Sequence, residues 1–203
     1  MNLHRVFHVQ NAYNKAVQSD NLRAVCLVVS LSFHFTTRQT PHKLRLNLAL
    51  CEENESDMSD VINFYSVSDE YGEFSNFALY PIKIKGKVWP TSEHYFQAMK
   101  FESQKDQAEI RKAKTPMEAA KKGRDRKRKL RKNWESSKDN VMREAVLQKF
   151  SQHENLKELL LSTGSSKLVE HTENDKYWGD GGDGRGKNRL GIILMEVRER
   201  LGT

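Results

Sequence analysis

A glycine-rich segment near the C-terminus combines residue types that could hold a sugar phosphate. Five of the eleven glycines fall between Gly179 and Gly186, and such a run is typical of a loop, because each glycine adds backbone entropy that folding must overcome. Asp175 and Trp178 precede the run. Three basic residues follow, namely Arg185, Lys187 and Arg189. A carboxylate beside an aromatic ring and a positive loop suits a sugar phosphate that carries a flat ring.

The loop leads into a predicted C-terminal helix. Leu190, Ile193, Leu194 and Val197 have the spacing of one buried helix face, and Gly202 stands where a glycine stop is expected. Unpaired amides and the positive dipole end at a helix N-terminus favour anions, so the sequence predicts an anion cradle here. The alternative interpretation is a solvated turn with a charged helix start.

A second candidate carboxylate, Glu93, heads a helix predicted over residues 93–102, with a threonine and a serine before it as candidate caps. Helical spacing puts Glu93, Gln97 and Lys100 on one face, and aromatic residues cover much of the remainder. Such a helix can line a pocket. The alternative interpretation of Glu93 is an acidic partner of the helix dipole in the first turn.

Composition limits the classes of protein that fit. The chain has 203 residues, a net charge of +7 and a mean hydropathy of −0.77. A basic surface attracts phosphates, whether of nucleic acids or of small metabolites. No stretch approaches the roughly 18 to 20 apolar residues of a membrane span, so we expect no membrane partner. The sequence does not indicate an oligomeric state.

Both cysteines, Cys26 and Cys51, lie in the first 60 residues. The remainder therefore has no disulfide framework, thiolate nucleophile or cysteine zinc site, which fits a cytoplasmic enzyme. Residues 1–59 also lack tryptophan and any sustained period. We predict a weakly ordered extension over residues 1–59 and a domain over residues 60–203.

Over residues 61–171 the hydrophobic pattern predicts short strands and helices. Strands are expected over residues 61–65, 82–84 and 167–171. Helices are expected over residues 106–114, 116–123, 134–150 and 155–161, the second of them after a capping box that starts at Thr115.

From Lys121 to Lys132, nine of twelve residues are Lys or Arg. A nucleic-acid patch is one interpretation. We favour a solvated basic loop, because no aromatic residue is interleaved for base stacking, although Arg124 could still reach a phosphate.

Several cofactor motifs are absent from the sequence. It contains no P-loop, no dinucleotide fingerprint and no EF-hand loop. His94, His153 and His171 are too scattered to suggest a metal site. We therefore predict that the protein needs neither a metal nor another cofactor.

Five separated motifs carry a specific resemblance. They are Ile62-Asn63-Phe64-Tyr65, Phe74-Ser75-Asn76-Phe77, the run from Trp89 through Glu93 to Ala98, Arg131-Lys132-Asn133-Trp134, and the run from Asn174 through Gly182 to Gly191. In this order they resemble the NADAR domain, and within it the YbiA-like N-glycosidases of riboflavin biosynthesis, over about residues 61–201.

The resemblance implies a mainly helical α+β domain with a small β-sheet. It also implies hydrolysis of the N-glycosidic bond in the first two riboflavin intermediates, which are small phosphoribosyl pyrimidines, as a means of limiting damage from reactive metabolites. The family's important residues fall on Glu93, Trp134, Asp175 and Trp178, which we predict to be catalytic. The residues assigned to substrate binding are Asn76, Phe77, Gln97, Arg124, Gly182, Gly184, Arg185, Lys187 and Asn188.

The chemistry of such a reaction agrees with these residue types. Cleaving a ribosyl C–N bond passes through an oxocarbenium-like state, which calls for a carboxylate near C1′, an acid or base, and a stacking surface for the ring. Which carboxylate activates water is left open. Two alternatives remain: removal of ADP-ribose from guanine or another ADP-ribosyl substrate, and a non-enzymatic nucleotide or nucleic-acid binding module.

Overall fold

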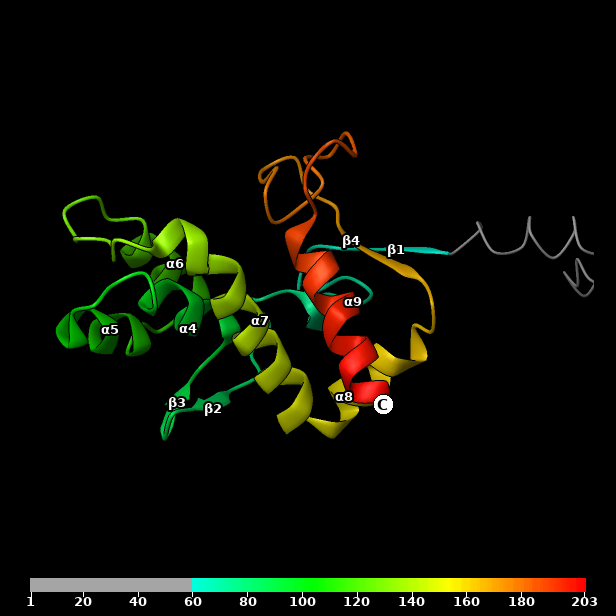
Figure 1. Cartoon of the computed structure of the whole chain (residues 1–203), viewed down its shortest axis with the longest axis horizontal. Helices are drawn as coiled ribbons and strands as arrows, with labels where there is room; N and C mark the ends of the chain where they lie inside the picture. The colour runs from blue at the N-terminus through cyan, green and yellow to red at the C-terminus, as the bar shows by residue number, and fades with distance from the viewer. Residues whose placement is uncertain (1–59) are drawn as a thin grey trace, which may run out of the picture. The chain divides into compact units, whose positions relative to one another are not determined.

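The structure is a computed structural model, and it describes residues 60–203 (Figure 1). The extension predicted for residues 1–59 lies outside the described residues. Over residues 60–203 the chain forms six α-helices and four short strands, so the predicted mainly helical α+β class is confirmed.

The elements follow one another in the predicted order. The strands are β1 (Val61–Phe64), β2 (Ile82–Ile84), β3 (Lys87–Trp89) and β4 (Lys167–Glu170). A single 3-10 turn, η1, covers Gly72–Phe74. The helices are α4 (Ser92–Ala98), α5 (Gln104–Arg111), α6 (Pro116–Gly123), α7 (Trp134–Gln152), α8 (Glu154–Ser162) and α9 (Arg189–Gly202).

Helix α4 ends at Ala98, four residues before the predicted end. The chain turns out of the helix there, and Phe101 forms an isolated β-bridge with Leu130, which lies in the basic segment. Phe101 is buried in the core. Packing of this aromatic side chain therefore stops the helix, a tertiary effect that the helical pattern does not contain.

The predicted small sheet is in fact two separate two-stranded sheets. Strand β1 pairs in parallel with β4, with Phe64 opposite Glu170. Strands β2 and β3 form an antiparallel hairpin. Its tight turn places Lys85 and Gly86 at φ 51° and 75°, the left-handed pair that a two-residue hairpin favours.

Helices α7 and α9 form the centre of the domain and lie side by side, with their first turns toward the same end as the orange 171–188 segment (Figure 1). The four apolar residues that predicted the buried face of α9 are all buried: Leu190, Ile193, Leu194 and Val197. Burial of each such side chain contributes roughly 1.5–3 kcal/mol to the free energy of folding. This packing fixes the end of the domain at which the glycine-rich segment lies.

Lys149 of α7 is a fully buried cation that holds the segment leading to Asn76. Its Nζ donates hydrogen bonds to the carbonyl oxygens of Glu73 and Ser75, the latter at 2.9 Å. Burial lowers the pKa of Lys149 to about 7, with the Glu73 charge acting in the opposite direction. Lys149 therefore links the middle of α7 to the backbone after η1.

We expect Lys149→Met to lower the free energy of unfolding by about 1–3 kcal/mol, because two buried carbonyl oxygens lose their donor. The net loss is moderated by removal of a buried charge. Urea unfolding monitored by circular dichroism measures it, with Lys157→Met on α8 as the control, which should change stability by less than about 0.5 kcal/mol. Equal stability of the two variants would contradict the proposed link.

Over residues 60–203, none of the helices has the length and apolar character that crossing a bilayer requires.

Candidate active site

The first turn of α4 buries Glu93 beneath the segment that follows η1. Thr91 caps the helix, as predicted, with its side chain accepting a hydrogen bond from the His94 amide. The Glu93 amide donates to the carbonyl oxygen of Asn76 at 3.1 Å. Glu93 itself is only 5% exposed, which is far more burial than a carboxylate that serves the helix dipole needs.

The Glu93 carboxylate has one direct partner and several charged neighbours. Gln97 donates from Nε2 to Glu93 Oε1 at 2.7 Å. Burial raises the pKa of Glu93, and the Gln97 hydrogen bond and the charges of Lys100 and Arg124 oppose that rise. The charge of Asp175 adds to it. The Phe96 ring of α4 packs against Trp178 with 5.2 Å between centroids, and the Trp178 amide donates to Asp175, so the helix that carries Glu93 contacts the turn that carries Asp175.

Asp175 is held in a fixed orientation by the turn that it begins. Its Oδ1 accepts hydrogen bonds from the amides of Tyr177 and Trp178, at 2.7 and 2.8 Å. This Asx-type turn sets the direction of both the carboxylate and the Trp178 ring. Asp175 and Trp178 are both half-buried, so they lie at the surface of the site rather than beneath it.

Phe96 of α4 stands between the two predicted tryptophans. Its ring centroid lies 5.1 Å from that of Trp134 and 5.2 Å from that of Trp178. Lys100 Nζ lies 5.5 Å from the Phe96 centroid. Trp134 is only 6% exposed, which makes it a wall of the site, whereas Trp178 keeps surface on which a flat ring could stack.

Asp139 of α7 was not among the predicted site residues, and it holds Tyr177, the neighbour of Trp178, in place. It accepts from the Tyr177 hydroxyl at 2.7 Å and from Arg189 Nε at 2.8 Å. The Tyr177 ring packs edge-on against Trp178, with 5.1 Å between centroids. Because nothing local distinguishes a mid-helix aspartate, only tertiary structure could reveal this role.

The side chain of Asp180 holds the glycine-rich loop together through three hydrogen bonds. Asp180 Oδ1 accepts from the amides of Thr172 and Gly182, and Oδ2 is hydrogen-bonded to His171 Nδ1 at 2.8 Å. A Cβ on Gly186 would stand 2.4 Å from the Gly179 carbonyl oxygen. Only glycine at position 186 therefore allows the two ends of the loop to come this close.

The prediction that the first amides of α9 are free to bind an anion is wrong. The amides of Arg189 and Leu190 donate to the carbonyl oxygens of Tyr177 and Trp178, at 3.0 and 3.1 Å. Backbone groups of the loop thus occupy donors that the pattern assigned to an anion. The loop positions Trp178 through these bonds.

Two polar residues assigned to substrate binding are engaged within the protein. Asn188 has a φ of 46°, and its side chain accepts from the Glu170 amide at 3.0 Å and donates to the Leu168 carbonyl oxygen at 2.8 Å. Asn76 donates to the sulfur of Met142 at 3.1 Å. Both side chains therefore hold the site together.

The other assigned residues differ in exposure. Phe77 and Gly182 are half-buried, and Gln97 is buried beside Glu93. Arg124, Gly184, Arg185 and Lys187 are exposed. Of the exposed group, Arg124 is the residue whose charge acts to lower the pKa of Glu93.

The basic segment Lys121–Lys132 is partly structural. Lys122 pairs with Glu109 at 3.0 Å, and Arg128 pairs with Asp106 and with Glu109. The segment's other exposed basic residues are Lys121, Arg124, Arg126, Lys127, Lys129 and Lys132.

Glu170, at the end of β4, is a carboxylate that sequence reasoning missed. Its Oε2 is buried and has no hydrogen-bond partner among residues 60–203. Burial is the main cause that raises the pKa of Glu170 to about 7, and the charges of Asp175, Glu93 and Asp180 raise it further. The one sequence feature that could have drawn attention to Glu170 is its position at the end of a predicted strand.

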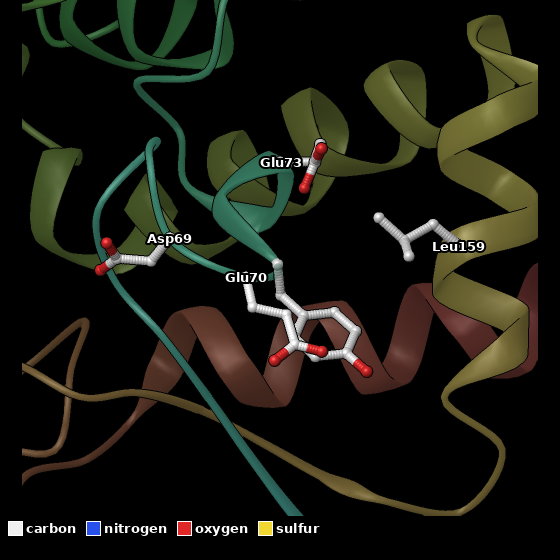
Figure 2. Close-up of a pocket in the computed structure, with 5 residues that line it drawn as sticks. Asp69, Glu70, Glu73 and Leu159 are labelled. Carbon is white, nitrogen blue, oxygen red and sulfur yellow. The ribbon is translucent and has the colours of Figure 1, made fainter.

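No group of three or more His, Cys, Asp or Glu side chains within residues 60–203 is arranged to hold a metal ion. A separate pocket of about 320 Å³ (Figure 2) is lined by Asp69, Glu70, Tyr71, Glu73 and Leu159. It includes none of the candidate residues, and its carboxylates would repel a phosphate.

Comparisons with known proteins identify the family of the chain. The family model described as NADAR domain matches residues 63–202. The "N-glycosidase YbiA" of Escherichia coli is 65% identical over 141 residues, which cover 70% of this chain and 88% of that protein. The "Riboflavin biosynthesis protein VVA0006" of Vibrio vulnificus is 40% identical, over 77% of this chain and 43% of that protein.

The solved NMR structure of E. coli YbiA matches with a TM-score of 0.67 at 64% identity, over 71% of this chain and 86% of that one. A family match over most of the chain and a relative of this identity agree with the resemblance carried by the five motifs. The chain therefore belongs to the NADAR domain family.

Proposed function

We propose that this protein is an N-glycosidase that hydrolyses the N-glycosidic bond of the first two riboflavin biosynthesis intermediates. The products would be ribose 5-phosphate and the free pyrimidine amine, and removal of these reactive intermediates would limit damage. The observation that carries the proposal is the contact between Phe96, three residues after Glu93 on α4, and Trp178, whose amide donates to Asp175. The E. coli relative is named an N-glycosidase and the Vibrio relative a riboflavin biosynthesis protein, and the two names together support this activity.

The proposed roles follow from the charge that develops at C1′. A carboxylate near the oxocarbenium-like carbon stabilises the positive charge, and Asp175, fixed by two backbone amides, is oriented for this. The half-buried Trp178 ring would stack on the pyrimidine. Arg124 supplies a cation on the Glu93 side that suits the 5-phosphate.

The test is to incubate the purified protein with each phosphoribosylamino-pyrimidine and to measure release of ribose 5-phosphate, with and without EDTA. We expect turnover of both substrates, unchanged by the chelator. Absence of turnover on either substrate would overturn the proposal, and a rate restored by one divalent ion would overturn the prediction that no metal is needed.

A second candidate is an ADP-ribosyl hydrolase, and the exposed basic residues beside Arg124 favour it, because they could bind a substrate with more phosphates. Release of ADP-ribose from an ADP-ribosylated guanine substrate, without release of ribose 5-phosphate from the pyrimidines, would identify this function. Salt-sensitive nucleic-acid binding with no turnover would indicate a binding module instead. Cytoplasmic location stays a prediction from cysteine usage.

We also propose that residues 60–203 are sufficient for the activity. The family match begins at residue 63, and every residue placed at the site lies after it. A chain shortened to start at Met58 should keep its melting temperature and its kcat/KM to within about twofold. Loss of soluble expression or of turnover would show that the preceding residues pack on the domain.

A further inference from the structure

Glu170 differs from the other carboxylates of the site in what surrounds it. Its backbone is fully engaged: the amide donates to Asn188 Oδ1 at 3.0 Å, and the carbonyl oxygen accepts from the Asp180 amide at 3.0 Å. The side chain, by contrast, has a buried Oε2 with no partner among the described residues. A buried polar atom without a partner is costly, and such atoms mark places where a ligand or functional group is expected.

The charged groups that act on Glu170 are all acidic. Glu93 acts on it from α4, and Asp175 and Asp180 act on it from the loop. The residue opposite it on β1 is Phe64, and the next residue, His171, is directed to Asp180. Carboxylates that share a low-dielectric site cannot all be ionised, so this arrangement favours a proton on one of them.

We propose that Glu170 is a further catalytic residue, the general acid that protonates the departing amine. This inference rests on the proposed N-glycosidase function. The Glu170 carboxyl gives its proton to the amine nitrogen as the C1′–N bond breaks, and the bonding electron pair stays on that nitrogen. Water then adds to C1′ and gives its proton to Asp175. Asp175 releases that proton to solvent, and solvent returns one proton to Glu170, so both carboxyl groups regain their starting states. The sum is one water consumed and one free amine formed.

The different surroundings of Glu170 and Asp175 explain why the first is assigned the acid role and the second the base role. Two backbone amides hold Asp175 Oδ1, which suits a group that acts as an anion. Glu170 has a pKa raised to about 7, which suits a group that delivers a proton near neutral pH. Two titratable groups whose environments separate their protonation states are a common basis for acid and base roles in one site.

The first test is Glu170→Gln, which keeps the shape of the side chain and removes the transferable proton. With the pyrimidine substrates we expect kcat/KM to fall roughly 10²-fold. In the wild-type protein kcat/KM should fall as pH rises above about 7. The pH profile of the variant should lack this decline. Glu158→Gln on α8, an exposed position, is the matched control and should show the wild-type profile.

The second test uses 4-nitrophenyl ribofuranoside 5-phosphate, whose leaving group departs as a stable anion and needs no proton. Here Glu170→Gln should retain turnover to within about threefold, while Asp175→Asn should not. A merely structural role of Glu170 would lower turnover of both substrate types equally, and that result would overturn the inference.

The outcomes separate the inference from the function on which it rests. A wild-type protein that cleaves the aryl riboside but neither pyrimidine would refute the proposed function, and with it the role of Glu170 in protonating their amine. A wild-type rate on the pyrimidines that does not decline above pH 7 would overturn the Glu170 inference alone, even if the variant failed to fold. Inactivity on every ribosyl substrate would overturn both.

Discussion

Asp175→Asn should lower kcat/KM on the pyrimidine substrates by roughly 10²-fold or more while the melting temperature stays nearly constant. The asparagine retains Oδ1, so the hydrogen bonds from the amides of Tyr177 and Trp178 can persist. The turn and the Trp178 ring should therefore keep their positions. What disappears is the negative charge that opposes the cation developing at C1′. Steady-state kinetics and thermal unfolding of the same preparation measure the two quantities.

The loop offers a matched control for this variant. Asp183 is exposed, and its Oδ1 accepts from the Arg185 amide in the same kind of local turn. Asp183→Asn changes net charge by the same amount in the same segment, and it should leave kcat/KM within about twofold of wild type. If Asp175→Asn behaved like this control, Asp175 would not be a catalytic residue.

Local patterns predicted the elements of the fold well where the deciding interactions are local. The i, i+3, i+4, i+7 spacing in α9 places all four apolar residues in the core, and Thr91 caps α4 through its own side chain. The alternating burial in β2, whose strand was expected over residues 82–84, has the same local origin. The end of α4 was missed because it depends on where Phe101 packs.

The site was predictable only in part, for the same reason. Motif resemblance selected Glu93 and Asp175, and the fold brings these two together. The glycine run predicted a loop correctly, but the use of its amides depends on carbonyl groups of Tyr177 and Trp178, which no local rule identifies.

Long-range contacts also explain the residues that were missed. Asp139 and Glu170 acquire their surroundings from segments far away in the sequence. In both cases the residue type was visible in the sequence, and the partners that give it a role were not.

Glu93→Gln should lower activity while leaving stability equal to or higher than that of the wild type. We expect kcat/KM to fall roughly 10²-fold, because the buried carboxyl can no longer exchange a proton or carry charge beside Asp175. The Gln97 Nε2 donor keeps an oxygen acceptor at the same place, so packing should persist. Relief from burying an ionisable group should make the variant at least as stable as wild type at neutral pH.

The sign of the pH dependence follows from the raised pKa of Glu93. A carboxyl whose pKa is higher in the folded state than the unfolded value of 4.5 contributes stability below that value and loses it as pH rises. The melting temperature of Glu93→Gln relative to wild type should therefore increase as pH rises above 4.5.

A helix-dipole role for Glu93 predicts the reverse, a loss of about 0.3–1 kcal/mol with activity intact. Glu154, exposed in the first turn of α8, provides the comparison, since Glu154→Gln should show that pattern. Glu93→Gln with near-wild-type turnover and a lower melting temperature would assign Glu93 to the dipole and remove it from the catalytic residues. Lower turnover with equal or higher stability would be the behaviour of a functional carboxylate that the fold buries at a cost in stability.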